Sequence, residues 1–254
     1  MKTQPDWETV PEGWRDSDPR ARGWQHDSVA RVMRHHWPRW SAIVRSNAPL
    51  GIMPLAPHGG IGLGHNLSMT FGYVLARAAY GKAHMAMLDW GGAFGHYALM
   101  AHALMPELPI EVTVKEMPGL AKVGRTLQPN VNFVDSDAEA FSRKYDLVMA
   151  SNSLQYAEHW RDIVARLAQA STQWLFITRL PLARRSASFL VVQRPHAVGF
   201  QTEYISWVLN RDDFLAHMAS LGMAVAREFL AHEVTQYVGA SEASEAFGFL
   251  FRRD

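Results

Sequence analysis

The sequence predicts an α/β protein built on a mostly parallel sheet with helices on both faces. Three observations predict this fold. Short apolar segments with strand character alternate with helical segments after residue 65. A Gly-rich turn follows the first of these strands, which is the usual form of a ligand-binding βα unit. Two strand-like segments, 223–230 and 246–251, then follow each other near the end of the chain. We therefore expect a seven-stranded sheet closed by an antiparallel hairpin.

Composition limits the function classes. The 254 residues are 48% hydrophobic, which suits one large domain or one domain with an added cap. The formal net charge of +1 gives no reason to expect nucleic acid as a partner. The absence of cysteine excludes disulfides, a thiol nucleophile and zinc–thiolate sites, and we predict no metal site. No apolar run suggests a signal segment or a membrane span, so we expect a cytoplasmic protein with no membrane partner.

The N-terminal quarter differs from the rest. Residues 1–23 are polar, and we expect an irregular arm held in place by Trp7 and Trp14. Helical spacing of apolar residues follows from Ser28, with Asp27 as the expected cap and Pro38 as a kink or break. The Pro- and Gly-rich residues 47–64 predict a hinge. We therefore divide the chain into an arm and helical cap or lid, 1–64, and a ligand-binding domain, 65–254.

The central part of the chain contains five segments with strand character. They are predicted at 85–88, 110–116, 131–134, 145–150 and 174–178, and a helix is predicted to begin at His65-Asn66. A short extra strand, 189–193, lies inside a long connection, and Asn210 is expected to cap the last helix. Strands alternating with helices indicate right-handed βαβ units, whose carboxyl ends meet at one edge of the sheet.

Acidic residues stand at these strand ends. Asp89 precedes the turn with Gly91, Gly92 and Gly95. It either anchors the turn or accepts a hydrogen bond from a ligand ammonium group. Glu116 ends the second strand and either binds both hydroxyls of a ribose or is a solvated acid. Asp137 follows the third strand and either accepts from an adenine amino group or caps a helix.

The turn also limits the kind of ligand. Ala93 interrupts a G-x-G pattern, and no phosphate-binding GxxxxGK[ST] motif is present. A nucleoside with a charged tail therefore fits these residues better than a dinucleotide does.

The stretch Asp89–Gly95 resembles the D/E-x-G-x-G-x-G motif of class I S-adenosylmethionine-dependent methyltransferases, with Ala93 in place of the middle glycine. Several segments more closely resemble a bacterial family of predicted methyltransferases found among surface-polysaccharide and secondary-metabolite genes. These segments are His65-Asn66, 88–92, 116–118, 150–156 and 178–181, and the similarity extends over roughly residues 50–220.

The resemblance implies a Rossmann-like fold and S-adenosylmethionine as cofactor. It also implies that Glu116 binds the ribose, that Met117 packs on the adenine, and that Asn152 lies near the cofactor's amino group. Ala93 fits the turn if its φ is negative. The implied cofactor-binding residues are Asp89, Gly91, Gly92, Gly95, Glu116, Met117, Ser136, Asp137, Ser151 and Asn152.

Residues for catalysis and substrate binding are predicted at the same edge. Three histidines are candidate bases, namely His65, His96 and His159, and we prefer His65 because it opens a helix just before the first strand. With it we assign Asn152 and Tyr156 as catalytic. Substrate contacts are predicted for Asn66, Gln155, Arg179, Tyr204 and Trp207. For each of these residues the alternative is packing, helix capping or a structural ion pair.

Three functions remain open from the sequence. The first is methylation of a small molecule in the biosynthesis of a secondary metabolite or sugar. The second is a cyclase in which the amine of the cofactor attacks its own Cγ, forming azetidine-2-carboxylate and releasing methylthioadenosine. The third is a non-catalytic cofactor-binding protein. A homodimer is also possible. The many aromatic and Met residues fit the cyclase as well as they fit an apolar acceptor.

Overall fold

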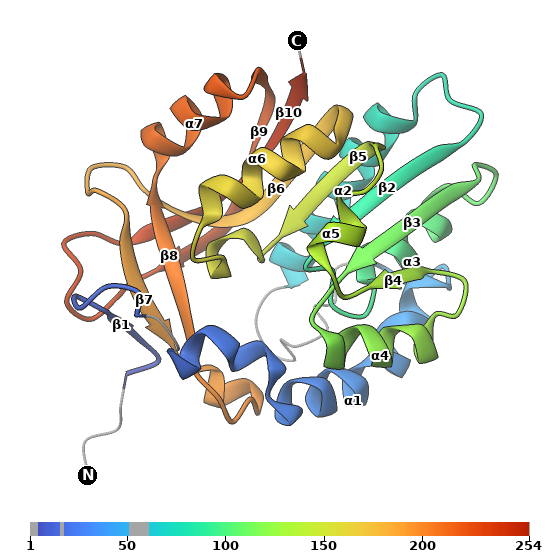
Figure 1. Ribbon diagram of the computed structural model, residues 1–254. Helices are drawn as coiled ribbons and strands as arrows, with labels where there is room; N and C mark the ends of the chain where they lie inside the picture. Colours follow the sequence, from blue (N-terminus) through green and yellow to red (C-terminus); the bar gives the residue numbers. More distant parts are fainter. Residues whose placement is uncertain (1–4, 16–17, 51–60, 254) are drawn as a thin grey trace.

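The computed structural model describes residues 5–15, 18–50 and 61–253. One twisted sheet runs through the centre of the molecule, with helices on both faces (Figure 1). Its strands are β1 (Trp7–Thr9), β2 (Met85–Trp90), β3 (Ile110–Lys115), β4 (Asn132–Val134), β5 (Tyr145–Ser151), β6 (Ser171–Ala183), β7 (Phe189–Gln193), β8 (Tyr204–Asn210), β9 (Met223–Thr235) and β10 (Ser244–Arg253).

The sheet contains the predicted arrangement. Strands β4, β3, β2, β5 and β6 lie side by side and are parallel, and β10 and β9 close the sheet as an antiparallel hairpin beside β6. The expectation of seven strands was too small, because the described sheet has ten. The carboxyl end of β6 also pairs in parallel with β8. Strand β7 then pairs antiparallel with β8, and β1 pairs antiparallel with β7.

Helices pack on the sheet in two layers. The α-helices are α1 (Asp27–Val44), α2 (Ile61–Ala79), α3 (His96–Leu104), α4 (Pro118–Leu127), α5 (Asp137–Ala140), α6 (Trp160–Ala170) and α7 (Arg211–Ser220). Three short 3-10 helices complete the set, η1 (Pro19–Gln25), η2 (Leu154–Tyr156) and η3 (Pro195–Val198). The first four α-helices share one hydrophobic core, and α6 and α7 share the other.

The alternation of side chains along β6 shows how the sheet separates these cores. Trp174 and Phe176 are buried in the core beneath α1–α4, whereas Leu175 and Ile177 are buried in the core beneath α6 and α7. Successive side chains of a strand point to opposite faces, so a strand covered on both faces is apolar throughout. The two layers leave the carboxyl edge of the parallel strands as the place where polar loops meet.

Two helix starts differ from the sequence prediction. His26 rather than Asp27 caps α1, because its Nδ1 accepts the hydrogen bond of the Ser28 N–H. Pro38 lies inside one continuous helix. Helix α2 begins by Ile61, so it does not open at His65. The predicted hinge falls largely on residues 51–60, outside the described residues, and the division of the chain at residue 64 stays a prediction.

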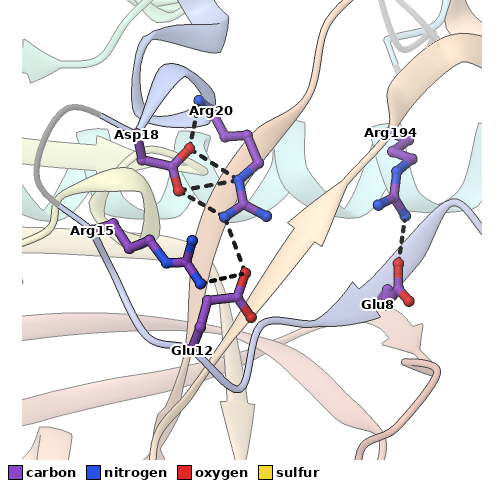
Figure 2. A network of polar contacts seen from close by, with 6 residues as sticks. All are labelled: Glu8, Glu12, Arg15, Asp18, Arg20 and Arg194. Carbon is purple, nitrogen blue, oxygen red and sulfur yellow. Dashed lines mark hydrogen bonds and ion pairs between the residues drawn. The ribbon is translucent and has the colours of Figure 1, made fainter.

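The N-terminal arm is fixed to the added strands. Trp7 packs edge-on against Tyr237, and Trp14 stacks on Trp207, as expected for an arm held by two indoles. Figure 2 shows the polar contacts of the same segment. Arg20 chelates the carboxylate of Asp18, and Arg194 binds Glu8 at 3.0 Å. The first contact stabilises the start of η1, and the second joins β1 to the residue that follows β7.

Two glycines of α4 provide a test of the packing beneath this helix. A Cβ on Gly124 would lie 2.3 Å from the Phe133 ring, whereas a Cβ on Gly119 would meet nothing within 4 Å. We expect Gly124→Ala to lower the free energy of unfolding by about 1–3 kcal/mol through overpacking. Gly119→Ala, the matched control, should leave it unchanged or raise it by up to about 1 kcal/mol. Denaturant unfolding measures both, and equal effects would contradict this description of the helix.

Candidate active site

A cavity of about 830 Å³ opens at the carboxyl edge of the parallel strands. One half is formed by the β2–α3 turn and by the residues after β3 and β5. The other half is formed by η1, α1, α2 and the segment around β8. The predicted site residues that line it are Asp89, Gly91, Gly92, His96, Glu116, Met117, Asp137, Ser151, Asn152, Tyr156, His159, Arg179 and Tyr204.

The turn after β2 has a left-handed backbone. Gly91 has φ +75° and Gly95 has φ +76°. A Cβ on Gly91 would lie 2.3 Å from the Cβ of Ser153, so the glycine allows the turn to approach the loop after β5. Ala93 has φ +52°, and the expectation of a negative φ was therefore wrong. Its N–H donates to Glu116 at 3.0 Å, which helps to hold this strained conformation.

Two acids lie beneath the turn. Both carboxylate oxygens of Asp89 are fully buried and have no hydrogen-bond partner among the described residues. Burial, with the nearby Glu116 carboxylate, raises the pKa of Asp89 to about 8. Burial also raises the pKa of Glu116, although the backbone N–H groups of Met117 and Ala93 donate to its carboxylate. The protein thus holds unbalanced acidic groups where a cationic ligand would neutralise them.

Two further residues at this edge have a left-handed backbone. Asn152, just after β5, has φ +53°, and its N–H donates to the carbonyl of Thr178. Arg179 has φ +56° and belongs to a β-bulge, in which Thr178 and Arg179 together face Gly248 of β10. A Cβ on Gly248 would lie 2.8 Å from the Thr178 Oγ1. The bulge places Arg179 among the residues that line the cavity.

Asp137 is bound from two sides. Its Oδ1 accepts a hydrogen bond from the Trp90 indole at 2.8 Å and an ion pair from Lys115 at 3.2 Å. Ser136, predicted at the adenine, instead caps α5 by accepting from the Ala138 N–H, and it does not line the cavity. The alternative role of helix cap thus belongs to Ser136 and not to Asp137.

The three candidate bases are placed very differently. His65 is exposed and does not line the cavity, because the cavity face of α2 carries Leu63, Gly64, Leu67 and Ser68. His159 lines the cavity from an exposed position. His96, the first residue of α3, lines it from the interior.

The surroundings of His96 keep its ring neutral. Its ring lies edge-to-face with Trp37 and Trp40 at centroid distances of 5.2 and 4.6 Å. Burial lowers its pKa to about 4, so the imidazole is neutral at physiological pH. The structure therefore favours His96 over the preferred His65.

Other predicted residues lie outside the cavity. Asn66 donates to the Leu230 carbonyl, and Trp207 donates to the Glu158 carbonyl, so both tie elements together. Gln155 is buried and donates to the Asn152 side chain. Gly95 is packed over Gln128. These four residues support the cavity from behind, and the structure gives none of them contact with it.

Sequence reasoning missed several residues that line the cavity. Trp24, Tyr97, Lys115, Ser153 and Phe200 are examples. Tyr97 follows His96 directly and shares a 3.0 Å hydrogen bond with Ser151. Lys115 and Ser153 lie at or near the ends of predicted strands, so the rule that places ligands at strand ends could have identified them. No sequence signal links Trp24 to a loop some 180 residues away.

The two buried acids make a pH-dependent prediction for the ligand-free protein. Because the folded state holds a proton on Asp89 up to about pH 8, the parent loses stability as pH rises from about 4 to 8. Asp89→Asn removes this dependence. Its stability relative to the parent should rise over this window by at most about 1.4 kcal/mol per pH unit, and should then stay constant.

Thermal unfolding between pH 5 and 9 measures this difference. Asp137→Asn is the control, and it should lose stability because Lys115 and Trp90 both bind that carboxylate. A pH-independent difference between Asp89→Asn and the parent would refute a raised pKa at Asp89.

The described residues were compared with the requirements of a membrane-spanning helix and of a metal site. None of the described helices has the length and apolar character needed to cross a membrane. Within residues 5–15, 18–50 and 61–253, no three His, Asp or Glu side chains gather as a group able to hold a metal ion.

Comparison with known proteins gives the fold. No protein-family model and no curated protein matches the sequence. A candidate sarcosine dimethylglycine methyltransferase from Galdieria sulphuraria is similar in structure, with TM-score 0.58, 13% identity, and coverage of 90% of this chain and 99% of that one. The [4+2]-cyclase SpnF has TM-score 0.55 and 11% identity, over 87% of this chain and 92% of that one.

A S-adenosylmethionine-dependent methyltransferase from Clostridium acetobutylicum gives TM-score 0.50 and 9% identity, over 73% of this chain and 92% of that one. At such identities these likenesses speak for the fold alone. The chain has the Rossmann-like fold of class I S-adenosylmethionine-dependent methyltransferases, and its sheet also contains the strands β1, β7 and β8.

Proposed function

We propose that this protein binds S-adenosylmethionine in the cavity and methylates a small molecule. The observation that carries the proposal is the left-handed turn Gly91–Gly95 above two buried acids, Asp89 and Glu116. S-adenosylmethionine is a nucleoside with a cationic tail. It complements both the exposed backbone of the turn and the unbalanced carboxyl groups beneath it.

The residues present fit this cofactor. Glu116 directly follows β3 and is a buried acid whose carboxylate can accept hydrogen bonds from the ribose hydroxyls besides those from its two backbone donors. Met117 and Asp137 line the same half of the cavity, beside the place expected for an adenine. Because Gly91 and Gly92 have no Cβ, the turn can approach Ser153 and Asp89 closely, and no side chain of these two residues obstructs a ligand.

When bound, the cofactor would supply a methyl group already activated by the sulfonium. The chain then has to orient the acceptor and exclude water, which accounts for much of the acceleration in such a displacement. His96 offers a neutral ring, fixed by two indoles, that can accept the hydrogen bond of an acceptor hydroxyl or amine. Tyr97 and Ser151 add a linked pair of hydroxyl groups beside it.

The cyclase alternative uses the same cavity. The formation of azetidine-2-carboxylate needs no acceptor, only a pocket that bends the aminobutyrate chain of the cofactor. The aromatic residues Trp40, His96 and Tyr97 beside the turn favour such a pocket. The two proposals therefore differ in their products and not in their cofactor site.

One product analysis separates these functions. Purified protein is incubated with S-adenosylmethionine alone and then with small-molecule acceptors, and the products are identified by mass spectrometry. We expect S-adenosylhomocysteine only when an acceptor is present, because the methyl group needs a nucleophile. Asn47→Asp, on an exposed loop, serves as an active control variant.

Other products have clear meanings. Methylthioadenosine with azetidine-2-carboxylate, formed without an acceptor, would replace the transferase proposal by the cyclase. Tight binding of the cofactor without turnover under any condition would support the non-catalytic function.

Glu116 gives a direct test of the cofactor site. Glu116→Gln keeps the shape of the side chain but removes its charge and part of its acceptor capacity. We expect the affinity for S-adenosylhomocysteine to fall at least about tenfold, since hydrogen bonds to a charged group are worth about 1.5–3 kcal/mol. Calorimetric titration measures it, with the exposed Glu107→Gln as matched control. Unchanged affinity in Glu116→Gln would refute the ribose assignment.

A further inference from the structure

Four aromatic side chains that line the cavity contact one another and form a wall. This aromatic wall consists of Trp24, Tyr156, Phe200 and Tyr204. Trp24 and Tyr204 stack with centroids 4.3 Å apart and an interplanar angle of 8°. Tyr156 lies edge-on to both, at 5.2 and 5.8 Å. Such a surface favours a planar aromatic ligand, because rings gain from stacked and edge-to-face contacts beyond the area that they bury.

Two polar groups inside this wall lack hydrogen-bond partners. The Trp24 Nε1 and the Tyr204 hydroxyl are buried and bind nothing among the described residues. Tyr204 is only 1% exposed, and burial with the nearby Tyr156 raises its pKa, so the hydroxyl keeps its proton. The indole N–H is only a donor, and the protonated hydroxyl can donate as well. A buried donor without a hydrogen-bond partner destabilises the protein, and a ligand oxygen that accepts from it would remove this cost.

Other polar groups that line the cavity also favour a ligand oxygen. Arg179 brings a positive charge to the lining. Gln193 lines the cavity too, and its Oε1 already accepts from the Tyr156 hydroxyl. A cationic ligand would leave both unpartnered groups of the wall unmatched and would face Arg179. Glu158, which also lines the cavity, is the residue that would favour a cation, and the test therefore includes one.

The wall is built into the fold through the N-terminal arm. Gly23 lies so close to β8 that a Cβ there would come within 2.0 Å of the Glu203 carbonyl. Asp18 caps η1, the helix that contains Trp24, and its carboxylate is chelated by Arg20 (Figure 2). Arg194 binds both Glu8 of the arm and Glu203 beside β8. Trp24 is thereby held in its stack on Tyr204.

We propose that the aromatic wall binds an aromatic ligand carrying a hydrogen-bond-accepting oxygen, such as a phenol, with Trp24 and Tyr204 as donors to that oxygen. This inference rests on the proposed function and gives the acceptor class of the same cavity. The wall selects the ring by its faces and edges, and the two donors select the oxygen.

The test uses the protein saturated with S-adenosylhomocysteine and four small probes. Phenol combines a ring with an oxygen, toluene has the ring alone, cyclohexanol has the oxygen alone, and choline is a cation. Ligand-observed NMR titration measures their affinities. We expect phenol to bind most tightly. Tyr204→Phe and Trp24→Phe should each weaken phenol binding about fivefold, corresponding to one hydrogen bond of about 1 kcal/mol.

Two controls separate this inference from folding and from the proposed function. Trp14→Phe changes an indole of the same arm that stacks on Trp207 outside the cavity, so phenol binding should stay unchanged. All three variants should bind S-adenosylhomocysteine like the parent. Equal binding of toluene and phenol, tighter binding of choline, or an equal effect of Trp14→Phe would overturn the inference alone. Failure of the parent to bind S-adenosylhomocysteine would overturn the proposed function as well.

Discussion

The left-handed backbone at the carboxyl edge of the sheet is the constraint on which the cavity depends. The non-glycine residues with positive φ in the described chain are Ala93, Asn152 and Arg179, and all three line the cavity. Each such residue costs of order 1–3 kcal/mol and persists only where its surroundings hold it. Glu116 holds Ala93, the Thr178 carbonyl holds Asn152, and Gly248 leaves room for the bulge at Arg179. Strain is thus concentrated where the ligand is expected.

These supports come from distant parts of the chain, which explains why the closing hairpin matters to the site. Gly248 belongs to β10, the last strand, yet it faces the residue pair that directs Arg179 into the cavity. A side chain at that position would press on Thr178, whose carbonyl in turn binds the N–H of Asn152. The hairpin therefore closes the core and also fixes the loop after β5. The site is a property of the assembled sheet rather than of the glycine turn alone.

The sequence predicts the parts of the site that follow from strand position. Asp89 lies near the end of β2 and Glu116 directly follows β3, and their place at one edge follows from parallel topology. Prediction from the sequence fails where the direction of a side chain depends on the rotation of a helix about its axis, or on the φ of a single residue. Helix α2 begins four residues before His65, and the resulting phase turns that side chain to the exterior. The φ of Ala93 depends on a hydrogen bond from its N–H to Glu116, a contact that a residue pattern does not encode.

The two halves of the cavity have different origins, and this limits what the fold can say about function. The half around Asp89 and Glu116 is built by the parallel strands β2, β3 and β5 and the loops that follow them. The half around Trp24 and Tyr204 is built by the arm and by β8, which lie outside the seven-stranded core. Because likeness in fold names no ligand, the ligand of the half around Trp24 and Tyr204 has to be argued from its side chains. Those side chains are aromatic rings with two unmatched polar groups, and their complement is a ring that carries an oxygen.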